Sequence, residues 1–188
     1  ILLLESPQTN PWQIIENRFQ SMFHMTNDRK THFKTFAELA SEGAILKQNR
    51  AWLNKTEYLP LYEGKMFHHF DPRWGTYTTN TSTANKIKDP AELEKQDPKF
   101  YPQPQYWVSK EEVNHRTHVG LSWQIGIREI TNTTLKRTTI VSPLPLVAFG
   151  NKVPLIRMPD LSPVLRLCWV ALASSFALDF ASRQKLGA

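Results

Sequence analysis

The strongest fold signal in the chain is the stretch Ser162-Pro-Val-Leu-Arg-Leu-Cys-Trp-Val-Ala-Leu-Ala-Ser-Ser-Phe-Ala-Leu-Asp-Phe180. Ser162 is a residue type that caps helix N-termini, and Pro163 stands at the first helical position, where its missing N–H breaks no hydrogen bond. Gly187 suits the C-terminal cap. The stretch therefore predicts a long, buried C-terminal helix with Cys168 as a small core side chain. Its large apolar residues recur at helical spacing on one face, and they are Leu165, Trp169, Leu172, Phe176 and Phe180.

Short runs rich in β-branched residues precede this helix and are separated by proline and glycine. They predict mostly antiparallel strands. Thr35, or a neighbour, is expected to cap a short helix that Gly43 ends, and Ser109 is expected to start another that leads to His118. Residues 11–23 fit either a helix or a strand. The predicted fold class is α+β. The expected strands cover residues 44–46, 58–62, 121–130, 138–141, 146–149 and 153–156.

One domain is expected over residues 1–188, because 40% hydrophobic and 11% aromatic residues supply enough apolar surface for one core. Within it, residues 76–104 are rich in Thr, Asn and Ser and then in Pro, which predicts a long and partly mobile surface loop with one helical turn at 91–95. The first residue is not Met, so we expect the chain to be a piece of a larger polypeptide.

The 23 Lys and Arg residues exceed the 17 Asp and Glu residues, for a net charge of +6. Residues 123–157 hold five of the basic residues and one Glu, and so carry +4 of that excess. A single cysteine excludes an intramolecular disulfide and favours a cytoplasmic location. The longest apolar run is shorter than the ~20 residues that span a bilayer, so no membrane segment is expected.

Residues 128–137, Arg-Glu-Ile-Thr-Asn-Thr-Thr-Leu-Lys-Arg, place cations on both sides of short polar side chains. Arg and Lys neutralise phosphates and read guanine, Asn can pair with adenine, and Thr can contact a phosphate or a thymine methyl group. The expected structure is a strand, a turn and a second strand. An ordinary polar hairpin tip has the same composition, so both interpretations stay open.

Few residues suggest catalysis within the chain. Glu63 and Lys65 have the spacing of the Glu-x-Lys end of metal-dependent nuclease motifs, but an acidic partner at a persuasive position is absent upstream. The neighbouring His68 and His69 would point to opposite faces of an extended chain, which disfavours a shared metal ion and favours solvated or hydrogen-bonding histidines. No glycine-rich nucleotide loop and no Gly-x-Ser-x-Gly turn occurs. We therefore expect no catalytic residue and no metal or other cofactor in this chain.

A family resemblance lies in Leu59-Pro-Leu-Tyr-Glu-Gly-Lys-Met-Phe-His-His-Phe-Asp-Pro-Arg-Trp-Gly-Thr-Tyr77. This block resembles a signature in the C-terminal part of large bacterial adenine-N6 DNA methyltransferases of restriction–modification and phage-defence systems, including type IIG-like enzymes. Further ordered blocks resemble the same family, at residues 23–33, 97–98, 106–108, 123–132 and 180–187.

The resemblance implies a target-recognition domain that grips double-stranded DNA while a catalytic methyltransferase domain of the same polypeptide, using S-adenosylmethionine, flips and methylates an adenine. His69 and Pro72 depart from the family pattern, which argues against base reading there. The alternatives are a packing module without DNA contact and a Mg²⁺-dependent endonuclease using Glu63 and Lys65. The basic turn and the resemblance together give the candidate DNA-binding residues Lys65, His68, Arg73, Trp74, Arg128, Asn132, Thr133, Lys136, Arg137, Arg183 and Lys185.

Overall fold

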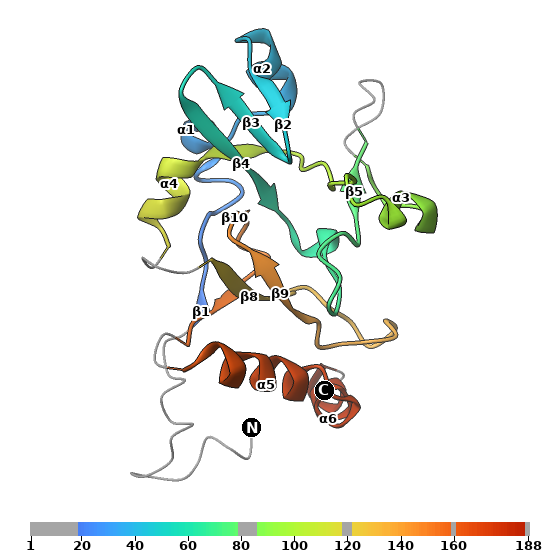
Figure 1. Ribbon diagram of the computed structural model, residues 1–188. Helices are drawn as coiled ribbons and strands as arrows, with labels where there is room; N and C mark the ends of the chain where they lie inside the picture. Colours follow the sequence, from blue (N-terminus) through green and yellow to red (C-terminus); the bar gives the residue numbers. More distant parts are fainter. Residues whose placement is uncertain (1–18, 79–85, 118–121, 159–160, 187–188) are drawn as a thin grey trace.

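The computed structural model describes residues 19–78, 86–117, 122–158 and 161–186 (Figure 1). Its fold is α+β, as predicted, with mostly antiparallel sheets, short helices and two C-terminal helices. The predicted C-terminal cap at residue 187 lies outside the described residues, as does most of the segment 11–23. The described end of that segment forms strand β1 (Phe19–Gln20) and buries Met22 and Phe23.

The first sheet has the order β1-β11-β8-β9, and all its pairs are antiparallel. Strand β8 (Trp123–Ile127) pairs on one side with the edge strand β9 (Val141–Pro145) and on the other side with β11 (Leu155–Ile156). Ile125 in β8 lies opposite both Pro143 and Ile156. Because β8 and β9 are adjacent and antiparallel, residues 128–140 form a loop that leaves the sheet and returns to it. We call this segment the β8–β9 loop.

The second sheet is built around β4 (Thr56–Tyr62), which pairs with β3 (Arg50–Leu53), β7 (Trp107–Ser109) and β10 (Ala148–Phe149). Strand β2 (Ile45–Lys47) is the edge strand beyond β3. The β10 pairing is parallel, whereas the other strand pairs of the described residues are antiparallel, as predicted for most strands. A long connection separates Tyr62 from Ala148, and long connections permit parallel pairing.

The short helices largely follow their predicted caps. Helix α2 (Phe36–Ser41) begins with a capping box between Thr35 and Glu38, and Ser109 caps α4 (Lys110–His115). Helix α4 ends at His115, before the expected end at residue 118, which is outside the described residues. A further short helix, α1 (Arg29–His32), follows β1.

Residues 76–104 contain more regular structure than the predicted loop. Strands β5 (Thr76–Tyr77) and β6 (Ile87–Lys88) pair as a small antiparallel ribbon, and α3 (Glu92–Gln96) forms where one helical turn was expected. Residues 79–85, between the two strands, lie outside the described residues, so mobility there stays a prediction.

Residues 59–77, which resemble the methyltransferase family, are called the family-like block. The main core anchors one turn of this block. Met66 and Phe67 are fully buried beside Leu61 and Phe149. Met66 ends the 3-10 turn η2 (Gly64–Met66), so this turn is fixed by apolar packing on its inner side while Lys65 remains exposed.

The C-terminal helix differs from its prediction. It is two helices, α5 (Pro163–Ala173) and α6 (Phe176–Leu186), with a 57° bend between them. The break falls at two serines: Ser174 caps the end of α5, and the Ser175 hydroxyl accepts a hydrogen bond from the Leu178 N–H at 3.2 Å. Serine side chains compete with the helical backbone in this way and favour helix ends.

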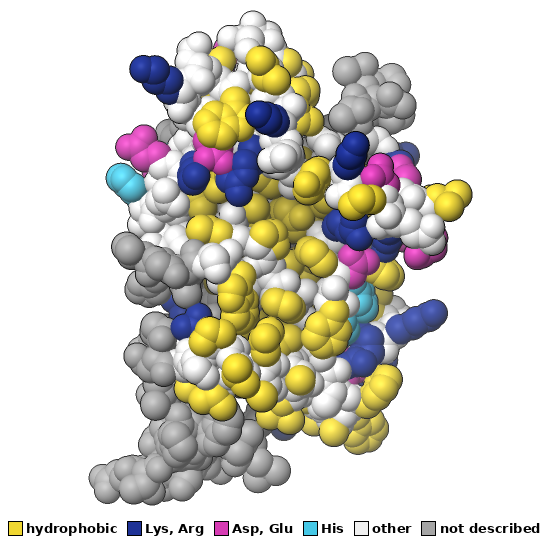
Figure 2. Space-filling model, viewed as in Figure 1, with side chains coloured by type: hydrophobic (Ala, Val, Ile, Leu, Met, Phe, Trp, Pro, Cys, Tyr) yellow, Lys and Arg dark blue, Asp and Glu magenta, His cyan; other side chains and the backbone are white. Residues whose placement is uncertain are grey.

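The predicted burial of this helix is also wrong. Helix α5 lies under the first sheet and contributes Val170 and Ala173 to a small core with Ile125 and Val141 (Figure 1). Cys168, expected in the core, is exposed. Figure 2 shows apolar side chains gathered over this part of the molecule. Four of the five residues predicted to share the buried face are more than half exposed, and they are Leu165, Leu172, Phe176 and Phe180.

Adding a side chain at Gly126 in β8 tests how tightly the first sheet is packed. A Cβ atom at this position would lie 2.6 Å from Leu144 Cδ1 and 3.0 Å from Val153 Cγ1. We expect Gly126→Ala to lower the free energy of unfolding by about 1–3 kcal/mol, because both neighbours are buried and must shift. Urea denaturation measures the change. Ser122→Ala, at an exposed position before β8, is the control and should change stability by less than about 0.5 kcal/mol.

Candidate nucleic-acid interface

The β8–β9 loop is fastened to α6 by one buried carboxylate, that of Asp179. Its Oδ1 accepts hydrogen bonds from the backbone N–H groups of Thr138 at 2.7 Å and Thr139 at 2.9 Å. The Thr138 hydroxyl donates to the same oxygen at 3.0 Å. Burial on its own raises the pKa of Asp179, but the Thr139 and Thr138 N–H groups outweigh it, so this pKa lies below its ordinary value.

Arg137 has an internal role in the same junction. Its guanidinium donates to the carbonyl oxygens of Ser174 and Ser175, and its Nε lies 3.5 Å from Asp179 Oδ1. The Phe176 ring lies under the guanidinium, at 4.5 Å. The break between α5 and α6 leaves the Ser174 carbonyl available to Arg137, because the Leu178 N–H donates to the Ser175 hydroxyl instead, whereas the Ser175 carbonyl also accepts the Asp179 N–H at 3.1 Å.

Arg183 holds the loop from the other side. Its guanidinium donates to three carbonyl oxygens of the loop, those of Thr133, Leu135 and Lys136, and it lies 3.7 Å from Asp179 Oδ2. Arg137 and Arg183 were predicted to bind DNA. The structure gives both of them partners inside the protein, so we assign them a positioning role.

Asn132 also differs from its prediction. Its side-chain Oδ1 accepts hydrogen bonds from Thr134 N at 3.0 Å, Thr134 Oγ1 at 2.7 Å and Leu135 N at 3.1 Å. This arrangement is an Asx turn, which stabilises the tip of the loop. An asparagine that pairs bidentately with adenine uses this oxygen to accept a hydrogen bond from the base. In Asn132 the oxygen is already occupied, so only the amide N–H groups remain for a ligand. Thr133 is exposed beside it.

Arg128 brings the loop against the family-like block. Its guanidinium donates to the Phe67 carbonyl oxygen and lies over the Phe67 ring. Gly64 permits this contact, because a Cβ atom there would lie 3.3 Å from Arg128 Cγ. Two segments far apart in sequence thus meet. They enclose a pocket of about 390 Å³, here called the loop pocket, that is lined by Glu63, Gly64, Lys65, Tyr77, Arg128, Ile130, Thr131, Asn132, Leu135 and Lys152.

The remaining candidates of the block form a second small cluster. The His68 and Trp74 rings lie 4.5 Å apart, and Lys95 Nζ lies 4.8 Å from the Trp74 ring. Burial, together with the nearby Arg128, lowers the pKa of His68 to about 4, so His68 is neutral at pH 7 and cannot serve as a phosphate-binding cation. Arg73 donates to the Asp97 carbonyl oxygen at 3.3 Å.

Three lysines among the candidates differ from the arginines, because their side chains have no partner among the described residues. Lys65, Lys136 and Lys185 are exposed, and their ammonium groups have neither an ion pair nor a hydrogen bond with the described residues. Lys65 lines the loop pocket, Lys136 belongs to the loop, and Lys185 follows Arg183 by two residues on α6. Lys65 and Lys136 thus lie beside or within a loop that Arg137 and Arg183 hold in place, whereas Lys185 lies on another face of α6 than Arg183.

The described residues offer little support for the endonuclease alternative. They contain no group of three or more His, Cys, Asp or Glu side chains that could hold a metal ion. Burial raises the pKa of Glu63, and its carboxylate hydrogen-bonds to Tyr77. Glu63 therefore lies in an environment that disfavours its charge.

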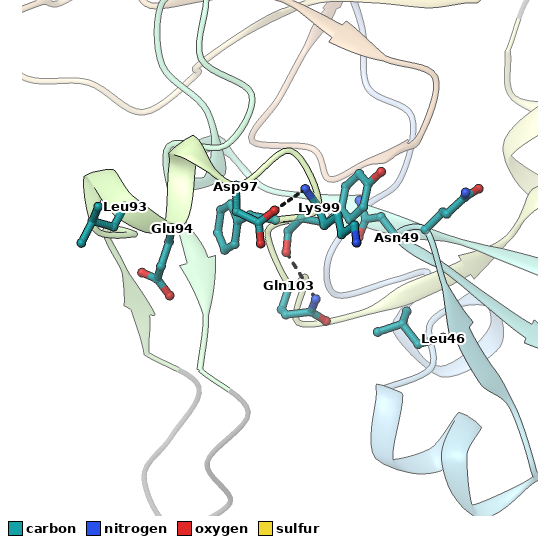
Figure 3. Close-up of a pocket in the computed structure, with 10 residues that line it drawn as sticks. Leu46, Asn49, Leu93, Glu94, Asp97, Lys99 and Gln103 are labelled. Atoms are coloured by element: carbon teal, nitrogen blue, oxygen red, sulfur yellow. Dashed lines mark hydrogen bonds between the residues drawn. The ribbon is translucent and has the colours of Figure 1, made fainter.

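A larger cavity of about 900 Å³ is lined by other residues (Figure 3). Leu93 and Glu94 of α3 line one side, and Leu46 of β2 lines the other. Asp97 Oδ1 accepts a hydrogen bond from Lys99 N at 2.8 Å at its wall. None of the candidate DNA-binding residues lines this cavity, and acidic side chains at its edge are unfavourable neighbours for phosphate.

Asp179 was missed in the sequence, although a lone acid between Leu178 and Phe180 in an apolar helix is a detectable signal. Asp179→Ala should lower the free energy of unfolding by about 3 kcal/mol at pH 7, because it leaves two loop N–H groups without an acceptor and removes the ion-pair partner of Arg137. Since the pKa is depressed in the folded state, this contribution is present at neutral pH and is lost as pH falls through the folded-state pKa, below 3.8.

Thermal unfolding from pH 7 to pH 3 measures this difference. Glu92→Gln, at an exposed position on α3, is the matched control. Equal stability of the Asp179→Ala variant and the wild type at pH 7 would contradict the assigned role.

No single helix in the described part of the chain is long and apolar enough to cross a membrane, and only the bent pair α5 and α6 taken together meets the length and composition test. Comparisons with protein-family models, with curated proteins and with solved structures found no match to this chain.

Proposed function

We propose that this chain is a target-recognition module that binds double-stranded DNA and positions it for an adenine-N6 methyltransferase domain of the same polypeptide. The module itself supplies no catalytic group, and S-adenosylmethionine is used by the catalytic domain. The resemblance of residues 59–77 and the later blocks to restriction–modification and phage-defence methyltransferases supports this proposal.

The observation that carries the proposal is the fixed loop with free lysines around it. Asp179, Arg137 and Arg183 hold the loop backbone, while Lys65 and Lys136 project from the loop and its neighbour into solvent. A surface ordered before binding loses less conformational entropy when it meets a ligand. Exposed lysines without carboxylate partners are available to neutralise phosphates.

A second function, packing against another part of a larger polypeptide, is favoured by the apolar surface of α5 and α6. Leu165, Phe176 and Phe180 are 53%, 79% and 67% exposed. Contiguous exposed apolar surface marks interaction sites in soluble proteins. This function predicts concentration-dependent association of the isolated chain in sedimentation velocity, which Phe176→Ser with Phe180→Ser should abolish.

DNA binding is tested by changing the three free lysines together. Lys65→Ala, Lys136→Ala and Lys185→Ala should weaken binding of a random-sequence duplex. Each lost phosphate contact should make the slope of log affinity against log salt less steep by about 0.9, and so by about 2.7 for all three. Fluorescence anisotropy at several salt concentrations measures both effects.

The matched control removes three lysines elsewhere, Lys30, Lys47 and Lys55, which are exposed on α1, on β2 and between β3 and β4. Its charge change is the same, so it should preserve most of the affinity if the lysines around the loop form the contact. An equal loss in both triple variants, or wild-type protein that does not bind duplex DNA at low salt, would refute the proposal.

A further inference from the structure

The loop pocket has the size and enclosure of a small-ligand site. Its volume of about 390 Å³ falls in the range of ~300–1,000 Å³ that is usual for such sites. One wall is the turn at Glu63, Gly64 and Lys65, which the buried Met66 anchors in the core. The opposite wall is the loop that Asp179 fastens to α6. Both walls are thus held by interactions outside the pocket.

Three side chains of the pocket wall carry a polar atom that is buried and has no hydrogen-bond partner among the described residues. These atoms are Glu63 Oε1, Arg128 Nε and Thr131 Oγ1. Buried polar atoms without partners are rare in folded proteins because they lose hydration without compensation. Neighbouring atoms cover all three, so binding at these atoms requires the side chains to rotate toward the pocket.

These atoms define the ligand by its hydrogen-bonding pattern. Glu63 Oε1 requires a donor, Arg128 Nε–H requires an acceptor, and the Thr131 hydroxyl can serve either role. The apolar lining of Ile130 and Leu135, with the ring of Tyr77, suits a flat ring. The edge of a nucleobase presents a donor next to an acceptor on a flat aromatic ring.

Two lysines of the loop pocket can bind the phosphate group of a nucleotide. Lys65 is exposed and has no ion-pair partner among the described residues, and Lys152 lies on the same pocket. Lys152 forms an ion pair with Glu129 at 2.8 Å, but both side chains are nearly half exposed. Exposed ion pairs contribute little stability, so Lys152 can exchange this partner for a phosphate.

We propose that the loop pocket binds a nucleotide, with the base against Glu63, Arg128 and Thr131 and the phosphate at Lys65 and Lys152. This inference does not require duplex binding by the surrounding lysines. The shared chemistry is that of a base with its phosphate, and the source is either a free mononucleotide or an unpaired base within a nucleic-acid strand.

Isothermal titration calorimetry of the 188-residue chain tests the inference with AMP, CMP, GMP and TMP, with inorganic phosphate, and with a short single-stranded oligonucleotide. At least one base-bearing ligand should bind with a dissociation constant below about 1 mM. Binding of mononucleotides identifies a free nucleotide as the source, whereas binding of the oligonucleotide alone identifies an unpaired base.

Thr131→Val removes one hydroxyl at nearly constant volume and should weaken binding about tenfold. Glu63→Gln changes the hydrogen-bonding pattern and is the second variant. Thr56→Val and Glu92→Gln, at exposed positions outside the pocket, are the matched controls and should bind as the wild type does. Circular dichroism checks that every variant is folded.

Three outcomes would overturn the inference. They are the absence of any base-bearing ligand with a dissociation constant below about 1 mM, binding of inorganic phosphate as tight as that of nucleotides, and unchanged nucleotide affinity in both folded pocket variants. Lys136→Ala with Lys185→Ala lies outside the pocket and separates the two proposals. It should weaken duplex binding and leave mononucleotide affinity unchanged.

Discussion

The hydrogen bonds between the Asp179 carboxylate and the backbone of Thr138 and Thr139 are the constraint on which the candidate site depends. The β8–β9 loop contains no helix or strand of its own, so its backbone polar groups need partners from elsewhere. Asp179 supplies an acceptor at the root of the loop, and Arg183 supplies donors to carbonyl groups near its tip. One acidic and one basic residue on consecutive turns of α6 therefore hold an irregular segment in a single conformation.

The arginines of the site illustrate the difference between a charge count and an electrostatic surface. The basic excess of residues 123–157 is real, but Arg128 and Arg137 direct their guanidinium groups to carbonyl oxygens of the protein. Arginine has five N–H donors in a rigid plane, which makes it suitable for joining carbonyl groups of separate segments. In the β8–β9 loop the exposed cation is consequently a lysine, Lys136.

Local sequence signals predicted local structure well. Thr35 and Ser109 cap helices, and the runs at 58–62 and 146–149 overlap strands, because these features depend on nearby residues. The burial of α5 and α6 could not be predicted in the same way. An apolar face at positions such as Leu172 and Phe176 shows that a helix has a surface to cover, but only the tertiary arrangement determines whether the protein covers it. The partners of Arg137 and Arg183 likewise depend on contacts between distant segments.

Gly75 in the family-like block is required by a close approach of two backbone segments. A Cβ atom on Gly75 would lie 2.4 Å from the Lys65 carbonyl oxygen, and the fully buried Phe67 lies between them in the sequence. Selection on such positions acts on folding, since any larger residue forces the backbone apart. Recurrence of glycine at this position in another chain would therefore reflect the same close approach of the backbone and would not identify the ligand of that chain.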